Sequence, residues 1–498
     1  MYKKIKGLLL SNTSTKQTVV KNIVWLSVGQ IGSRFIRAAV IIYAARVLGA
    51  AEYGLFSYAL GLAGFFTIFA DVGINSILTR EVAQNPEKES NYFATALSIK
   101  ITLIVGTILL ILFVAPYFSK IDDAIILLPF VAILTLFDNL REFTLSFFRA
   151  KEKMEIEAIV NVATNVAITL FGFFILSYIA TAQAMTITYA LSAGTGALFA
   201  IILLRNQYKK VFSHFDSSLL KPIIQTALPI AVLGLFGVFM LNIDMVMLGW
   251  WRTAEEIGFY SAAQKIVQVL YTLPSIIAAA IFPTIARFVG QKNDKGASLI
   301  MSTATVGALF LAIPLTIGGI VLSKSIILFL YGSSYLPATL VFQILVTTTL
   351  FIFPGTLFGN FVLAYNKQKK FAKYVALASI GNVIFNALLI PRFGIAGAAT
   401  ATIIVQSLYN AGAWLMVKKI NNFYTLQNIK RIVLAGIIMG ITAFFLDTIN
   451  LHVIINIIIS AIVYVLALFA LKEPLILEVK NFKKILGGNT KINTLSKE

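Results

Sequence analysis

Long apolar runs follow one another along almost the whole chain, and each has the length of a membrane-crossing helix. An α-helix needs about 20 apolar residues to cross a bilayer core. Only 12% of the 498 residues are charged, whereas a soluble domain carries about 25% charged residues. We therefore predict an all-α integral membrane protein with about fourteen transmembrane helices. The runs cover residues 22–46, 53–77, 93–118, 124–147, 156–180, 183–204, 222–250, 257–286, 297–322, 338–364, 371–390, 394–417, 431–448 and 452–471.

Lysine and arginine residues alternate in number between successive connecting segments. If the N-terminus is cytoplasmic, the inside segments carry 31 of the 41 basic residues and the outside segments carry five. Basic residues gather on the cytoplasmic side of membrane proteins. The alternation therefore predicts fourteen spans with both termini cytoplasmic. The first apolar run is too long for the core of a signal peptide, so we interpret it as a retained span.

Two pairs of segments indicate an internal repeat. Residues 52–59 (EYGLFSYA) match residues 256–263 (EIGFYSAA) with an offset of 204, and Asn161-Val-Ala-Thr-Asn165 matches Asn382-Val-Ile-Phe-Asn386. We predict two six-helix lobes related by a parallel pseudo-twofold axis, followed by two C-terminal helices. The predicted parts are an N-terminal tail (1–21), an N-lobe (22–205), a linker (206–221), a C-lobe (222–417), two further helices (431–471) and a C-terminal tail (472–498).

Basic side chains also occur deep inside two predicted spans. Arg34 and Arg37 lie near the middle of the first span and share one helical face with Ser27 and Gln30. Lys265 lies in the eighth span and shares a face with Gln268. A charge at this depth is costly, so it faces protein or water. The pattern favours a cationic cleft for an anionic group, and the alternative is ion pairing with intramembrane acids for packing.

Several intramembrane acids have more than one interpretation. Asp71 and Asp244 are candidates for binding a coupling proton or sodium ion, or for neutralising an arginine. Asp138, Arg141 and Glu142 can pair locally, which favours a structural role. Lys100 is near enough to the cytoplasmic side to extend towards it. Asparagine residues in membrane helices usually join one helix to another, and we expect this of the two asparagine pairs in the repeat.

The composition argues against several classes of function. The chain has no cysteine and only two histidines, His214 and His452, so we predict no metal site. No P-loop pattern is present, and no outside segment is long enough for a catalytic domain, so we predict that the protein is not an enzyme. The net charge of +20 is spread over loops between apolar runs, which is typical of contact with membrane lipids rather than nucleic acid.

Residues 46–84 read RVLGAAEYGLFSYALGLAGFFTIFADVGINSILTREVAQ. Further distinctive stretches are FFRAKEKM (147–154), NIDMVMLG (242–249), GFYSAAQKI (258–266) and LIPRFGIAGAATATIIVQS (389–407). The first stretch resembles the start of the polysaccharide (oligosaccharide) flippase family, which belongs to the multidrug/oligosaccharidyl-lipid/polysaccharide exporter superfamily, and the others match further pieces of that family. They are spread over nearly the whole chain, and their order and spacing carry the resemblance.

The resemblance implies export of a polyprenyl-diphosphate-linked oligosaccharide across the cytoplasmic membrane by alternating access. It also implies a cationic cavity between spans 1, 2, 7 and 8, the spans that contain Arg34, Arg37 and Lys265. Polysaccharide polymerases and glycosyltransferases are the expected partners. Alternatives are an ion-coupled drug or metabolite antiporter of the same superfamily, a lipid II-type flippase and, from other classes, a membrane glycosyltransferase or a scaffold.

Overall fold

The computed structural model describes residues 15–421, 423 and 429–474, and the regular elements in this part of the chain are all helical. The first half contains α2 (Thr15–Phe66), α3 (Ile74–Gln84), α4 (Glu89–Leu109), α5 (Asp122–Ile125), α6 (Leu128–Ala150), α7 (Met154–Tyr178), α8 (Ala182–Leu203), α9 (Arg205–Lys209) and α10 (Leu220–Trp251). The second half contains α11 (Ala254–Leu270), α12 (Thr272–Gly290), α13 (Asp294–Val321), α14 (Ser323–Tyr331), α15 (Ala338–Thr347), α16 (Thr349–Ala364), α17 (Gln368–Ile420), α18 (Ile429–Thr448) and α19 (Val453–Ala470).

The apolar lengths of these helices confirm a multi-pass membrane protein. Within the described residues, 11 helices are long and apolar enough to span a bilayer, or up to 12 if a pair bent by 45° within α10 counts as one span. Two of the 11 are 53 residues long: Gln368–Ile420 contains two of the predicted runs, and Gly32–Gln84 contains the run 53–77 and part of the run 22–46. The number of fourteen spans and the sides of the termini stay predictions, and residues 1–14 and 475–498 of the predicted tails lie outside the described residues.

Left-handed glycines divide the two longest helices. Gly49 inside α2 has φ 73°, and Gly394 inside α17 has φ 60°. Side chains disfavour this conformation, whereas glycine adopts it freely. Each glycine lies close to the predicted boundary between two spans, so a sharp turn separates two helical segments there. Arg252 donates to the carbonyl oxygens of Ile390 (2.7 Å) and Pro391 (3.0 Å), just before the second turn.

The chain divides into two compact units. The first contains Met1–Ser261 and Asn386–Ile395, and the second contains Ala262–Phe385 and Ala396–Glu498. The predicted lobe boundaries at 205 and 222 stay a prediction.

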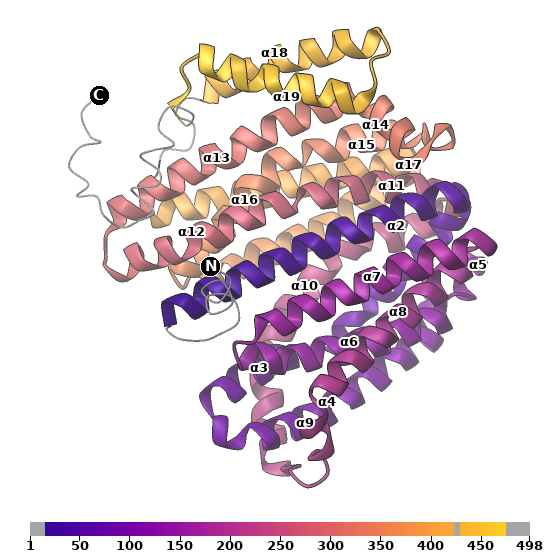
Figure 1. The fold of residues 1–498 in the computed structure, drawn as a ribbon, viewed down its shortest axis with the longest axis vertical. Coiled ribbons are helices and arrows are strands. Elements are labelled where there is room, and N and C mark those ends of the chain that lie inside the picture. Colours follow the sequence, from indigo (N-terminus) through magenta and orange to yellow (C-terminus); the bar gives the residue numbers. More distant parts are fainter. Residues whose placement is uncertain (1–14, 422, 424–428, 475–498) are drawn as a thin grey trace, which may run out of the picture. The chain divides into compact units, whose positions relative to one another are not determined.

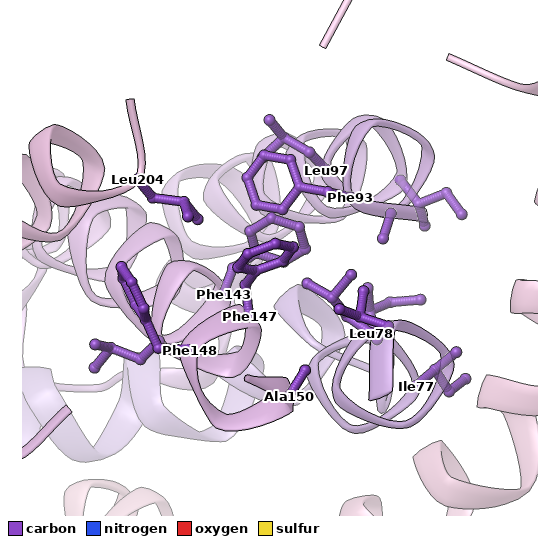
Figure 2. Close-up of a cluster of buried hydrophobic side chains, with 14 of the residues drawn as sticks. Ile77, Leu78, Phe93, Leu97, Phe143, Phe147, Phe148, Ala150 and Leu204 are labelled. Atoms are coloured by element: carbon purple, nitrogen blue, oxygen red, sulfur yellow. The ribbon is translucent and has the colours of Figure 1, made fainter. Parts of the chain in front are cut away.

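Aromatic side chains fill a core of the first unit where α3, α4 and α6 meet (Figure 2). The ring of Phe93 lies 5.3 Å from that of Phe143 and 5.4 Å from that of Phe147, measured between centroids. All three side chains are buried, and Leu78 and Leu97 lie beside them. This close packing joins the three helices.

The first half of α2 runs alongside α7 in the first unit (Figure 1). Small residues permit this close packing, because a Cβ atom added to Gly29 would lie 2.8 Å from Ala158. A Cβ atom added to Gly172 would likewise lie 2.5 Å from the side chain of Val40. Small residues at helix contacts are the usual solution in membranes. The segment of α2 that carries Arg34 and Arg37 is therefore held along a neighbouring helix.

The second half of α2 crosses the start of α11 through a reciprocal glycine contact. A Cβ atom added to Gly54 would lie 1.7 Å from the carbonyl oxygen of Ala254, and one added to Gly258 would lie 1.9 Å from that of Ala50. Gly54 and Gly258 occupy the same place in the two repeat segments, and Ala50 and Ala254 are also offset by 204. Repeat-equivalent residues thus meet as in a local twofold arrangement, which supports the predicted repeat.

The helix that follows Gly49 is interrupted inside the predicted run 53–77. The α-helix ends at Phe66, a short 3-10 helix covers Thr67–Ala70, and α3 begins at Ile74. Val72 and Gly73 between them have φ values of 38° and 88°. The span predicted at residues 53–77 therefore contains an interruption in the helix. The Asp71 carboxylate accepts from the backbone N–H of Asn75 (3.2 Å), which replaces helical bonding at the break.

The second unit contains a helical bundle and a C-terminal hairpin. Helices α12, α13 and α16 share a buried apolar core, and α18 and α19 pack together against α13 (Figure 1). The Tyr464 hydroxyl donates to the carbonyl oxygen of Phe310 (2.8 Å), and Asn456 donates to that of Ala443 (3.0 Å). The bounds of α18 and α19 agree closely with the two predicted C-terminal runs.

Candidate functional site

Arg34 and Arg37 have different surroundings on α2. The Arg37 Nε donates to the Asn165 Oδ1 on α7 at 2.7 Å, and the Arg37 side chain is half-buried. Arg34, one turn earlier, is exposed and has no hydrogen bond or ion pair with any described residue. The hydrogen bond through Nε leaves the terminal nitrogens of Arg37 to contact another group. The Arg37 side chain is thus oriented by Asn165, whereas the Arg34 side chain is exposed and forms no hydrogen bond or ion pair with a described residue.

Asn165 is itself held in place by the backbone. Its Nδ2 donates to the carbonyl oxygen of Asn161 (2.8 Å), which fixes the orientation of the amide and points Oδ1 towards Arg37. Beside it, the Thr169 hydroxyl donates to the carbonyl oxygen of Ile36 across the same helix pair (3.2 Å). Asn165 is 5% exposed. The expectation that this asparagine joins two helices is confirmed.

Asp244 lies in a second buried polar cluster of the first unit. Its Oδ2 accepts from the Tyr260 hydroxyl (3.1 Å), and its Oδ1 accepts from Asn386 Nδ2 (2.6 Å). Asp244 is 3% exposed, and Tyr260 and Asn386 are fully buried. Two neutral donors therefore hydrogen-bond a carboxylate that is buried inside the protein.

The two clusters correspond to each other in the repeat. Asn165 and Asn386 are the second asparagines of the matching pairs, and each contacts a charged residue on a different helix. The charge is positive at Arg37 and negative at Asp244. The same amide position therefore orients a cation in the first repeat and an anion in the second.

The other predicted substrate-binding residues are only partly described. In the second unit, Lys265 Nζ donates to Gln268 Oε1 at 3.4 Å, so these two side chains share one face of α11, as predicted. Both are half-buried. Gln30 belongs to α2, but its side chain lies outside the described residues. The role of all three in binding stays a prediction.

Asp71 forms an ion pair with Lys100 beside the break that precedes α3. Lys100 Nζ lies 3.1 Å from Asp71 Oδ1 and donates to Asn139 Oδ1 at 3.1 Å. The Lys100 side chain is fully buried, while that of Asp71 is 35% exposed. The expectation that Lys100 extends towards the cytoplasm was wrong, because its ammonium group is paired inside the protein. Asp71 neutralises a lysine rather than an arginine.

We expect Asp71→Asn to destabilise the protein more than Lys100→Met. The first change leaves a fully buried ammonium group without its counter-ion, which costs about 3 kcal/mol or more, whereas the second leaves a carboxylate that partly reaches solvent. Combining both changes should restore most of the lost stability. Thermal unfolding of the purified variants measures this order. Equal losses for the two single variants, with no recovery in the double variant, would contradict the ion-pair assignment.

The charged residues near the end of α6 pair locally, as predicted. Arg141 lies 3.0 Å from Asp138, and Glu142 lies 2.9 Å from Arg149. Arg149 also binds both carboxylate oxygens of Glu157 at 2.7 Å, which joins α6 to α7. These pairs stabilise the turn between α6 and α7. Among the described residues, none of these acids forms an ion pair with Arg34 or Arg37.

Sequence reasoning gave Asn165, Asn386 and Tyr260 no place in a site. The sequence did contain a signal for the two asparagines, because each is the second asparagine of an Asn-x-x-x-Asn pattern that occurs in both repeats. Tyr260 lies inside the repeat segment 256–263 but gave no separate signal. Within the described ranges, no group of three or more histidine, aspartate or glutamate side chains is placed to hold a metal ion.

Comparisons with known proteins show the family and the fold of this chain. The family described as polysaccharide biosynthesis protein matches residues 19–289, and the MatE family matches residues 229–388. The first match covers more than half of the chain. It contains Arg34, Arg37, Asp71, Asp244 and Lys265.

Two curated relatives and one solved structure extend this result. The chain is 23% identical to a probable low-salt glycan biosynthesis flippase, Agl15 of Haloferax volcanii, over 73% of this chain and 75% of the relative. It is 24% identical to a putative O-antigen transporter of Escherichia coli, over 81% of this chain and 98% of the relative. The structure of the lipid II flippase MurJ in an inward closed conformation superposes with a TM-score of 0.76 at 18% identity, covering 91% of this chain and all of that one. The predicted all-helical membrane fold is thereby confirmed, while the number of fourteen spans and the sides of the termini stay predictions.

Proposed function

This chain belongs to the polysaccharide biosynthesis protein family, and from that premise we propose that it is a flippase for polyprenyl-diphosphate-linked oligosaccharides. Such a lipid has a polar head group that hydrocarbon excludes and a tail that the bilayer accepts. The protein would shelter the diphosphate and the sugars while the tail stays in lipid. Relatives named as a flippase and as an O-antigen transporter support this substrate class.

The pair of arginines on α2 is the observation that carries the proposal. A charged side chain inside a membrane span is expensive unless water or an opposite charge reaches it. Arg34 is exposed without a partner among the described residues, and Asn165 directs Arg37 through its Nε only. Guanidinium groups bind phosphate oxygens through two parallel hydrogen bonds. We therefore assign the diphosphate to Arg34 and Arg37.

Lys265, Gln268 and Gln30 are the other side chains that we predict to contact the head group. The Lys265 ammonium donates to Gln268, and its positive charge suits an anionic ligand. Amide side chains such as that of Gln30 would bind sugar hydroxyls. Exposing the head group first on one side and then on the other requires alternating access. The tight contact of Gly54 and Gly258 supports a closed state near the turn at Gly49, which we predict to be outside.

Reconstitution with defined substrates tests the proposal. Purified protein in vesicles should move a polyprenyl-diphosphate oligosaccharide between leaflets, so that an added glycosidase gains access to sugars that were enclosed before. Vesicles without protein provide the baseline. Transport of small organic cations above the rate of vesicles without protein, with no movement of the lipid-linked oligosaccharide, would overturn the proposed substrate class.

Asp244 is our candidate for ion coupling. Its carboxylate is buried between neutral donors, so binding of a proton or sodium ion would change the charge of this cluster. We expect that an imposed proton or sodium gradient accelerates flipping and that Asp244→Asn removes at least about 90% of this acceleration. Asp447→Asn is the matched control, because that carboxylate accepts from Ser325 in the second unit. A gradient response that survives in Asp244→Asn would exclude Asp244 from coupling. Asp71 is the less favoured candidate because of its ion pair with Lys100.

The second candidate function is ion-coupled antiport of drugs or metabolites. The match of residues 229–388 to the MatE family is the observation that favours it. Organic cations prefer an acidic cavity, whereas the open charge on α2 is an arginine. A lipid II-type flippase is a closer alternative, because it also carries a diphosphate head group. Comparing lipid II with other lipid-linked oligosaccharides in the vesicle assay separates these two substrates.

We further propose that the protein works in the cytoplasmic membrane beside the enzymes of the same biosynthesis. Glycosyltransferases would build the lipid-linked unit on the inner leaflet, and a polymerase would consume it on the outer leaflet. The excess of basic residues in the predicted inside loops supports this orientation. Crosslinking in cells that retain and lack each enzyme would test these partners.

A further inference from the structure

A second concentration of positive charge lies on the second unit, away from Arg34 and Arg37 in the sequence. Three segments at its predicted cytoplasmic ends, residues 287–295, 367–373 and 418–419, contain nine lysines and arginines and one acid, Asp294. All nine basic side chains are exposed, and none forms an ion pair with a described residue. We call these nine residues the basic surface.

Hydrogen bonds bring the three segments together. The Tyr365 hydroxyl, just before the second segment, donates to Asp294 Oδ1 in the first at 2.8 Å. Asn421, just after the third segment, donates to the Asp294 carbonyl oxygen (2.8 Å) and to the Tyr365 hydroxyl oxygen (3.1 Å). Burial raises the pKa of Tyr365 to about 12, so the hydroxyl remains a donor at neutral pH. The basic surface is therefore one continuous feature of the fold.

The corresponding segments of the first unit have a different charge balance. Residues 80–89, 149–157 and 205–221 also contain nine lysines and arginines, but they contain seven acids. Several of these acids bind basic neighbours, as Glu157 binds Arg149 and Glu89 binds Lys151. The preference for basic residues on the cytoplasmic side is met by both units. The nearly complete lack of acids in the second unit needs a separate explanation.

The position of the basic surface indicates lipid rather than a soluble partner. Lys373 precedes a stripe of exposed apolar residues on α17, in which Leu377 is 67%, Ile380 is 54% and Ile384 is 52% exposed. These residues follow at helical spacing, so they form one lipid-facing side of the helix. The lysine therefore stands where that side reaches the lipid head groups.

The end of α17 shows the same arrangement. Leu408 and Leu415 are exposed, and Lys418 and Lys419 follow them. The Lys418 ammonium lies 5.1 Å from the ring of Trp414, a residue type that prefers the membrane interface. Basic residues in this setting attract anionic lipids, each by about 1 kcal/mol.

We propose that the basic surface binds anionic phospholipid head groups of the cytoplasmic leaflet and enriches them around the second unit. The inference does not depend on the proposed function. It would make the activity of the protein sensitive to the anionic lipid content of its membrane. Lysines 369, 370, 373, 418 and 419 are the groups nearest the lipid-facing sides of α17 and should contribute most.

Quenching of Trp414 tests the proposal directly. The full chain has four tryptophans, so Trp25, Trp250 and Trp251 are replaced by phenylalanine to leave Trp414 as the reporter. The protein is reconstituted in equimolar phosphatidylglycerol and phosphatidylcholine, with bromine on the chains of one lipid at a time. We expect the quenching to report a local preference for phosphatidylglycerol of at least about fivefold, the effect of one well-placed lysine.

Two variants decide the outcome. Replacing lysines 369, 370, 373, 418 and 419 by glutamine should reduce the preference to near one. The matched control replaces five exposed lysines of the first unit, 88, 153, 209, 210 and 221, and should keep the preference. A preference that is absent in the reporter protein, unchanged in the first variant or lost equally in both variants would overturn the proposal. Displacement of phosphatidylglycerol by soluble polyglutamate would also overturn it and indicate an acidic protein partner. Equal elution on size-exclusion chromatography verifies that the variants are folded.

Discussion

Flipping should fall about 100-fold or more when Arg34 and Arg37 are both replaced by glutamine. Truncating one partner of a buried, hydrogen-bonded charge pair costs about 2–5 kcal/mol, and 1.4 kcal/mol is a factor of ten. The single variants should differ. Arg34→Lys retains an ammonium that reaches a phosphate, whereas Arg37→Lys also loses the Nε donor that binds Asn165. We therefore expect Arg37→Lys to be the more damaging of the two, as measured by initial flipping rates in vesicles.

A matched variant separates the loss of charge from the loss of a specific group. Arg205→Gln removes an exposed arginine from α9 and should leave flipping within about twofold of the unmodified protein. Variants at Arg34 alone should insert and unfold like the unmodified protein, because Arg34 has no partner to lose among the described residues. Variants at Arg37 lose the hydrogen bond to Asn165, so their thermal unfolding is measured alongside flipping. Normal flipping by the Arg34→Gln, Arg37→Gln double variant at normal expression would remove both residues from the site.

Gly54→Ala and Gly258→Ala should each destabilise the protein by about 3 kcal/mol, the upper end of the usual range for overpacking. The added methyl group would lie 1.7 Å or 1.9 Å from a backbone oxygen of the opposite helix, so the two helices must move apart. Because both changes act on one crossing, their effects should not add, and the double variant should lose less than the sum. Thermal unfolding of purified protein measures all three values.

Glycines in open surroundings provide the control. A Cβ atom added to Gly307 in α13 or Gly359 in α16 would have no neighbour within 4 Å. Alanine at these positions should be neutral or slightly stabilising, since alanine favours helices more than glycine does. Equal stability of Gly54→Ala and Gly307→Ala would mean that the close crossing of α2 and α11 does not exist in the membrane.

The sequence predicted the large-scale features because they depend on local properties. Membrane spans follow from the apolar length of a segment alone. The helices α15 and α16 together cover residues 338–364, the range that the apolar run gave. The repeat segments 52–59 and 256–263 marked the place where repeat-equivalent glycines meet, although the contact itself was not foreseen.

The finer features could not be predicted because they depend on residues that are far apart in the chain. Lys100 and Asp71 lie on different helices and become an ion pair only when α4 packs beside the interrupted segment. The break after Phe66 could not be predicted from a proline, because the run 53–77 contains none. The environment of Arg37 depends on Asn165, which is 128 residues away. The sequence pattern identified Arg37 and Asn165 as polar residues in apolar helices, but it did not identify them as hydrogen-bond partners.

The most direct test of our account compares substrates that differ only in the charge of the linkage. Oligosaccharides joined to polyprenol through a diphosphate, a monophosphate or a neutral group would be flipped by the unmodified protein and by the Arg34→Gln, Arg37→Gln variant. We predict that the unmodified protein prefers the diphosphate by about tenfold or more and that the variant treats all three alike. An undiminished preference for the diphosphate in the variant would contradict the assignment of these arginines to the anionic head group.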